Sequence, residues 1–281
     1  MKFAILIITY TSPQQTMRLI SGMNNGDFDF YIHLDKKVDI ETHKDLFNIP
    51  NVYFIKNRID IKWAGFTTAE ASLSCVREIA ASGRKYDFLN LISGQDYPIK
   101  SAAYISEFLG KNIGKEFMLY NYFETEWEEA KARVEKYHFT DFKFKGRHRL
   151  ETLVNFITPK RKFPMPLNLA GRETFWTLSM EAAVYVLNYI DSNPRLQKFL
   201  RFTWGPDEFI YQSILLDSPY KDRIVNNNLR YMIWPTGSAR PKVLDKGDYD
   251  SIMASGGLFG RKFDMKSNPE ILDLLDSVNF K

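Results

Sequence analysis

The sequence predicts an α/β fold, with a sheet between layers of helices, in a single domain spanning residues 1–281. Over the first 100 residues, short apolar runs alternate with longer amphipathic segments, a pattern typical of β-α-β units. The opening run Lys2–Ile8 is continuously apolar, as expected of a strand buried on both faces. Because 44% of the 281 residues are hydrophobic, the chain can enclose a sizeable core.

The individual elements follow from periodicity and from the turn residues that bound them. The predicted strands, which are short apolar or aromatic runs, are Lys2–Ile8, Asp29–Leu34, Val52–Ile55, Tyr86–Leu91, Phe175–Leu178 and Leu229–Ile233. The predicted helices, with apolar residues three or four positions apart, are Pro13–Met23, Thr67–Ala81, Ser101–Leu109, Met180–Tyr189 and Glu208–Leu216. Pro13 suits the first turn of a helix because its missing N–H is not needed there. No repeat or linker divides the chain.

Polar side chains follow three of the predicted strands. They are Thr9 to Thr11, His33 to Lys37 and Ser93 to Asp96. Since the carboxyl ends of parallel strands meet at one edge of a sheet, these groups are expected to line one ligand-binding crevice. The sequence contains neither Gly-x-Gly-x-x-Gly nor Gly-Lys-Ser/Thr, so a dinucleotide or P-loop site is unsupported.

A different composition marks residues 124–166, predicted to be an insertion over this crevice. Ten lysines and arginines between 131 and 162 are interleaved with aromatic residues such as Trp127, Tyr137 and Phe142. One interpretation is a mobile segment that meets an acidic or lipid-linked partner, with peripheral membrane contact through 131–162. The other is an ordinary solvated surface.

The stretch from Thr203 to Phe209 is the candidate for the chemistry. Gly205 and Pro206 predict a turn or a first helical turn, where the helix dipole favours the acids Asp207 and Glu208. Such a turn would fix a carboxylate rigidly, as a general base requires. The alternative is an acidic first turn with no chemical role.

Charge and cysteine content narrow the functional classes. The net charge of +4, from 38 basic and 34 acidic residues, gives little support to a nucleic-acid partner. The single cysteine, Cys75, cannot form an internal disulfide, which favours a reducing compartment.

The opening apolar run lacks a signal-peptide cleavage site, and no apolar run approaches the about 20 residues of a membrane span.

Five short motifs occur in a fixed order along nearly the whole chain. They are HLDKK at 33–37, KWAGF at 62–66, LISGQDYPI at 91–99, PDE at 206–208 and LFGRKFD at 258–264. Together they resemble the core-2/I-branching β-1,6-N-acetylglucosaminyltransferases, a family that also contains peptide O-xylosyltransferases. The resemblance implies a GT-A-type, Rossmann-like nucleotide-sugar-binding fold with a mixed sheet flanked by helices. It also implies inverting transfer from a UDP-sugar to a glycan hydroxyl. N-acetylglucosamine is the expected sugar, and xylose or another sugar is the alternative.

The resemblance also implies residue roles. Glu208 matches the family's catalytic base. The residues matched to the donor are Asp35, Lys37, Asp96, Arg240, Arg261 and Lys262, and those matched to the acceptor are Glu124, Arg133, Asp207 and Trp234. Two of these roles remain open, because Asp96 either contacts the donor sugar or forms a structural bond, and Trp234 either stacks on a sugar or belongs to the core.

In this family, arginine and lysine near the C-terminus replace a metal at the diphosphate, so no metal or other cofactor is expected. Asp96 is the only acid in its motif, and the four histidines show no ligand spacing. The expected partners are a UDP-sugar and a glycan or lipid-linked glycan, and no nucleic acid. The expected setting is the bacterial cytoplasm, with the inner face of the plasma membrane as the peripheral alternative, in the synthesis of surface polysaccharide. A non-catalytic nucleotide-sugar- or glycan-binding protein on the same fold is the competing hypothesis.

Overall fold

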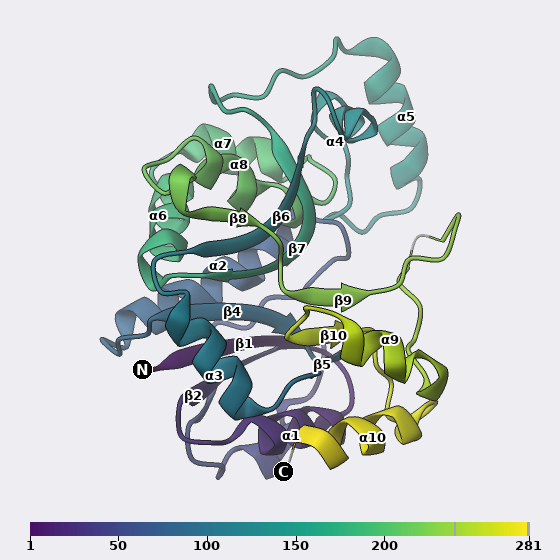
Figure 1. Ribbon diagram of the computed structural model, residues 1–281. Helices are drawn as coiled ribbons and strands as arrows, with labels where there is room; N and C mark the ends of the chain where they lie inside the picture. The colour runs from purple at the N-terminus through teal and green to yellow at the C-terminus, as the bar shows by residue number, and fades with distance from the viewer. Residues whose placement is uncertain (239, 280–281) are drawn as a thin grey trace.

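A mixed sheet forms the centre of the computed structural model, which describes residues 1–238 and 240–279 (Figure 1). Its strands are β1 Phe3–Thr9, β2 Phe28–Leu34, β3 Val52–Phe54, β4 Phe88–Ser93, β6 Glu116–Tyr122, β7 Ala170–Leu178 and β8 Ile224–Asn226. They lie in the order β3-β2-β1-β4-β7-β6-β8. The first four are parallel, β7 is antiparallel to β4 and β6, and β8 is parallel to β6. The predicted α/β class with a mixed sheet flanked by helices is confirmed.

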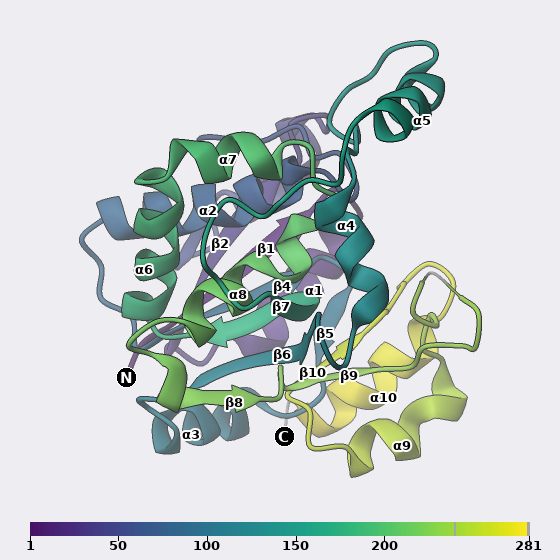
Figure 2. The ribbon, with the colours of Figure 1, turned by 90° about the horizontal axis from the view of Figure 1, so that it is seen from above.

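Helices cover both faces of this sheet, as Figures 1 and 2 show. Helices α2 Phe66–Ala81, α6 Met180–Asp191, α7 Pro194–Leu200 and α8 Ile210–Leu216 form one core with the sheet, and α1 Pro13–Met23, α3 Ala102–Lys111, α9 Tyr249–Ala254 and α10 Pro269–Asn279 form the other. Strand β1 divides its side chains between the cores: Ala4 and Leu6 belong to the first, and Phe3, Ile5 and Ile7 to the second. This alternation explains why a strand buried on both faces is continuously apolar.

A second, three-stranded sheet lies beside the first. It consists of β5 Asp96–Pro98, β9 Arg230–Met232 and β10 Phe259–Arg261, in the order β5-β10-β9. Strand β10 is antiparallel to β5 and parallel to β9. Strand β10 therefore brings the C-terminal motif at 258–264 next to the motif at 91–99, which includes the end of β4 and the whole of β5.

One predicted helix is wrong at its start. The structure has a 3₁₀ turn at Pro206–Glu208 (η3), and α8 begins only at Ile210. Phe209 separates the two with φ −144° and ψ −19°, which is not helical. The backbone of Glu208 and Phe209 lies so close to Gly171 of β7 that a Cβ there would collide with both. Glu208 is therefore fixed on a short turn against the sheet, and it does not lie on a regular helix.

The segment at 124–166 contains η2 Glu128–Ala130, α4 Lys131–Glu135 and α5 Arg147–Ile157. Helix α5 stands apart from the sheet in both views (Figures 1 and 2). Asp141 attaches the segment to the body by accepting hydrogen bonds at the N-terminus of α2, from the Phe66 N–H at 2.9 Å and the Thr67 hydroxyl at 2.8 Å. The remaining 3₁₀ turns are η1 Ile40–Leu46, η4 Lys221–Arg223 and η5 Lys246–Asp248. Within the described part of the chain, no helix combines the length and apolar character needed to cross a bilayer.

Candidate functional site

The turn that carries Glu208 is held from two sides. Gly205 precedes it with φ +59°, a left-handed conformation that glycine adopts without steric cost. Its N–H donates to the Ala64 carbonyl at 2.8 Å, and a Cβ on Gly205 would lie 2.8 Å from the Arg133 guanidinium. The motif at 62–66 and the PDE motif are thus packed together, and Glu208 is rigidly positioned.

Arg133 holds one oxygen of the Glu208 carboxylate. The Arg133 Nη1 donates to Glu208 Oε2 at 2.5 Å. The guanidinium itself lies over two indole rings, 4.4 Å from the centre of Trp127 and 4.3 Å from that of Trp204, an arrangement that favours a fixed cation. Within the described residues, no donor reaches Glu208 Oε1. One carboxylate oxygen is therefore anchored and the other is open to accept a proton.

An exposed indole extends this cluster toward solvent. Trp63 packs edge-on against Trp204, with 5.5 Å between ring centres, and 76% of Trp63 is exposed. Sugars stack their C–H faces on such rings. Sequence reasoning assigned no role to Trp63 or Trp204, although Trp63 belongs to a quoted motif and Trp204 is three residues from Asp207.

Asp207 differs from its neighbour. It is buried, and its Oδ2 accepts a hydrogen bond from the Thr174 hydroxyl of β7 at 2.7 Å. Burial raises the pKa of Asp207, and the negative charge of Glu208 raises it further. The structure places Asp207 beneath the turn as a support, whereas Glu208 is partly exposed. The contact of Asp207 with the acceptor stays a prediction.

Glu173, on β7, is a second carboxyl near Glu208 that sequence reasoning missed. Burial, with a smaller contribution from the charge of Glu208, raises the pKa of Glu173 to about 7, whereas Arg261, Arg172 and Trp234 act in the opposite direction. No pattern in the sequence indicated this, because the predicted strand Phe175–Leu178 begins two residues after Glu173. Glu173 connects the surroundings of Glu208 with Arg261, predicted to contact the donor, and with Trp234, predicted to contact the acceptor.

The raised pKa of Glu173 predicts a pH-dependent effect on stability. The carboxyl keeps its proton in the folded state up to about pH 7, whereas it ionises near its ordinary pKa of 4.5 in the unfolded state. Stability therefore falls as pH rises between these values, and Glu173→Gln removes the penalty. We expect the variant to unfold with a free energy about 1–2 kcal/mol higher than wild type at pH 8, and the gain to shrink toward pH 5. Urea denaturation at pH 8 and pH 5 measures the free energy of unfolding of the variant and wild type, and Glu181→Gln, at an exposed carboxylate, is the control. An equal gain in stability at the two pH values would contradict the prediction.

On the donor side, Asp96 is fully engaged within the protein. Its Oδ1 accepts from Arg261 Nη1 at 2.8 Å, its Oδ2 accepts from the Ser93 N–H at 2.5 Å, and Arg261 also bonds the Ser93 hydroxyl. Asp96 is buried. Of its two possible roles, the structure shows the structural bond, which holds β10 against the end of β4. A contact between Asp96 and the donor sugar stays a prediction.

Three cations gather next to this bond. Burial lowers the pKa of Lys262, and the nearby charges of Arg261 and Arg240 lower it further. Arg240 is exposed, and Lys262 is half-buried. Neighbouring cations of this kind form a site suited to an anion such as a diphosphate.

The other strand ends converge as predicted. The Asp35 N–H donates to the Thr9 carbonyl at 2.8 Å, and the Gly94 N–H donates to that of Ile8 at 3.1 Å. Asp35 is buried, and its carboxylate pairs with Lys37 Nζ at 3.0 Å. Asp35 and Lys37, which were both matched to the donor, are therefore in contact with each other.

The predicted acceptor residues are only partly brought together. Arg133 touches Glu208, whereas Glu124 is exposed and pairs with Lys131 Nζ at 2.8 Å. Trp234 is 50% exposed, so it is not a core tryptophan. Among the described residues, no three His, Cys, Asp or Glu side chains are placed to hold a metal ion.

Comparisons with known proteins identify similar sequences. The family model described as Core-2/I-Branching enzyme matches residues 3–252. The chain is 24% identical to Xylosyltransferase oxt of Drosophila melanogaster, covering 82% of this chain and 26% of that protein. It is 24% identical to Xylosyltransferase 2 of Rattus norvegicus, covering 97% of this chain and 33% of that protein. The chain thus spans about a quarter to a third of these relatives' length.

Solved structures of similar shape include a galactosyltransferase, LgtC, in complex with donor and acceptor sugar analogues. Its TM-score is 0.48 at 10% identity, over 100% of this chain and 97% of that chain. Mouse xyloside xylosyltransferase 1 matches with a TM-score of 0.41 at 10% identity, over 92% and 96% of the two chains.

Proposed function

The chain belongs to the Core-2/I-Branching enzyme family, and from this premise we propose that it is an inverting glycosyltransferase. It moves a sugar from a UDP-sugar to a hydroxyl of a glycan or lipid-linked glycan. The observation that carries the proposal is the geometry of Glu208. Arg133 anchors one carboxylate oxygen at 2.5 Å, the other is open, and the exposed Trp63 lies beyond Trp204 in the same cluster.

In the proposed reaction, Glu208 takes the proton of the acceptor hydroxyl while the hydroxyl oxygen bonds to the anomeric carbon. The bond between that carbon and the UDP oxygen breaks, and UDP leaves with the electron pair from the face opposite the attack. The cations Arg240 and Lys262 compensate the charge that develops on the diphosphate. Each group acts where charge or a proton moves, so the residues form one coherent mechanism.

The sugar is the finer part of the proposal. N-acetylglucosamine is the expectation carried from the resemblance, and the xylosyl alternative is supported by the names of the two relatives. A thermal-shift screen of UDP-sugars discriminates them, because a ligand at 100 times its Kd stabilises the folded state by about 2.7 kcal/mol. UDP binding without turnover on any acceptor would favour the non-catalytic hypothesis instead.

We propose that the protein's own cations take the place of a metal. Asp96, the acid at the position where a metal-binding pair would be expected, is already bonded to Arg261. Transfer is therefore expected to persist in excess EDTA, with little gain from added Mn²⁺. Loss of activity in EDTA that Mn²⁺ restores would contradict this part of the proposal.

Removal of a cation provides the complementary measurement. Lys262→Ala and Arg240→Ala are each expected to weaken UDP binding about tenfold and uridine binding much less, since the lost contact is to phosphate. Calorimetric titration with both ligands measures the difference. The control is Lys85→Ala, which removes an exposed lysine outside all five motifs. Equal losses for UDP and uridine would place these side chains elsewhere.

A further inference from the structure

Helix α5 turns its polar face toward its own protein. Asn155 exchanges two hydrogen bonds with the Tyr137 backbone, at 2.7 and 2.8 Å, and Glu151 accepts from the Phe139 N–H at 2.8 Å. These bonds attach the helix to residues 137–139 of the same segment, which have no regular secondary structure. A surface helix normally does the reverse and packs its apolar face inward.

The apolar side of α5 faces solvent instead. Phe156 is 86% exposed and Ile157 67%, and Leu150 and Leu153 are also exposed. Positions 150, 153 and 157 follow helical spacing, so these side chains form one stripe. Phe142 and Phe144, which are also exposed, precede the helix. None of the eleven residues of α5, all of them described, is buried. An exposed apolar stripe of this kind indicates an interaction surface.

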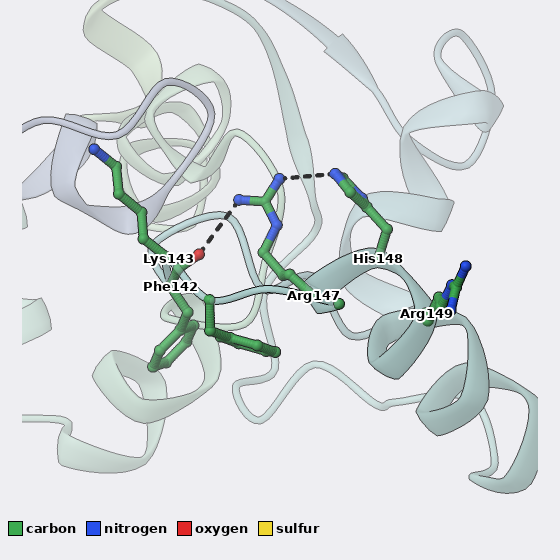
Figure 3. Close-up of a pocket in the computed structure, with 7 residues that line it drawn as sticks. Phe142, Lys143, Arg147, His148 and Arg149 are labelled. Carbon is green, nitrogen blue, oxygen red and sulfur yellow. Dashed lines mark hydrogen bonds between the residues drawn. The ribbon is translucent and has the colours of Figure 1, made fainter.

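Cations surround the stripe, and the two acids of the same stretch are engaged in hydrogen bonds within the protein. The exposed cations between 137 and 162 are Lys143, Lys145, Arg149, Lys160 and Lys162, of which Lys160 pairs with Glu135 at 2.6 Å. The two acids between 136 and 162 are Asp141 and Glu151, and both accept backbone hydrogen bonds within the protein. Figure 3 shows Lys143 and Arg149 pointing outward on opposite sides of a surface hollow, with Arg147 turned to His148 between them. The face therefore presents positive charge around an apolar stripe.

We propose that this face, the α5 stripe with its five cations, docks on an anionic lipid bilayer. The apolar side chains would enter the boundary between headgroups and acyl chains, while the cations meet the lipid phosphates. A lysine and arginine rim around aromatic and aliphatic residues matches both layers of that boundary. The surface is firmly joined to the body, because Asp141 caps α2 and Arg161 donates to the Phe199 carbonyl at 2.6 Å. This inference does not depend on sugar transfer, since vesicle binding requires neither donor nor acceptor.

Sedimentation with vesicles tests the proposal on the full chain. Binding to phosphatidylcholine vesicles with 30% phosphatidylglycerol is expected to exceed binding to pure phosphatidylcholine by about tenfold or more, and to weaken with salt. The double variant Leu153→Ser/Phe156→Ser is expected to bind the phosphatidylglycerol-containing vesicles at least about tenfold more weakly than wild type. Ile113→Ser is the matched control, because Ile113 is 55% exposed and Leu153 is 53% exposed. The double variant Lys143→Gln/Lys145→Gln should reduce only the part of the vesicle binding that depends on phosphatidylglycerol.

A site-specific probe locates the contact. The only cysteine, Cys75, is fully buried, and burial raises the pKa of its thiol well above the usual range, so Phe156→Cys can be labelled selectively. The emission of a fluorophore attached at position 156 is expected to shift to shorter wavelength on the anionic vesicles and to be quenched by doxyl lipids. The emission of the same fluorophore attached to Ile113→Cys is expected to show neither change. Equal binding to both vesicle types, an unaffected label at 156, or shielding of that label by a second copy without vesicles would each overturn the proposal.

Discussion

Substitution of Glu208 by Gln is expected to lower the rate of sugar transfer by about 10²–10⁴, the usual contribution of a general base. The amide keeps the shape of the side chain and an oxygen that can still accept from Arg133, which lies 2.5 Å from Glu208 Oε2. It cannot take the proton of the acceptor hydroxyl. Because Glu208 faces the acceptor in the proposed mechanism, the affinity for UDP should change little.

Two measurements on the purified variant separate chemistry from binding. Single-turnover transfer reports the lost rate, and calorimetric titration with UDP reports donor affinity. Glu181→Gln removes an exposed carboxylate on α6 and should match wild type in both. Wild-type turnover by Glu208→Gln would refute the assignment of the base, and loss of both turnover and UDP binding would indicate a disturbed fold.

The second large effect concerns Arg230, which joins the two sheets. From β9, its guanidinium donates to the Asn90 side chain and to the Leu91 carbonyl of β4, the latter at 2.9 Å, and to the Thr177 hydroxyl of β7 at 3.3 Å. Burial lowers the pKa of Arg230 to about 10, so the group remains charged at neutral pH. It therefore makes charge-assisted hydrogen bonds where water has little access.

Arg230→Met is expected to lower the free energy of unfolding by about 3 kcal/mol, because several acceptors lose a charged donor at once. Since β9 pairs with β10, which carries Arg261 and is followed by Lys262, UDP binding should weaken as well. Urea denaturation measures the first effect. The matched control is Arg77→Met, which removes a solvent-exposed pair with Asp191 and should cost no more than about 1 kcal/mol. Equal losses for the two variants would contradict a special role for Arg230.

The extent to which sequence predicted the site depended on the kind of feature. The convergence of Thr9, Asp35 and Gly94 was predictable, because parallel strands fix where their ends meet. The roles of Arg240 and Lys262 came from the family resemblance alone, and they remain predictions. Glu173 was missed, since its proximity to Glu208 comes from the packing of β7 against a turn more than thirty positions later. Spacing along the chain carries no information about such a contact.

Local order was readable from the amino-acid sequence: which runs form strands, which faces are apolar, and that Gly205 and Pro206 form a turn before two acids. These are consequences of backbone sterics and of hydrophobic periodicity, which act within a few residues. Long-range packing sets the rest: Asp207 is buried while Glu208 is partly exposed, Asp96 bonds Arg261, and α5 turns its apolar stripe outward. In each case the outcome depends on which distant segment supplies a partner, and burial and charge pairing are properties of that neighbourhood.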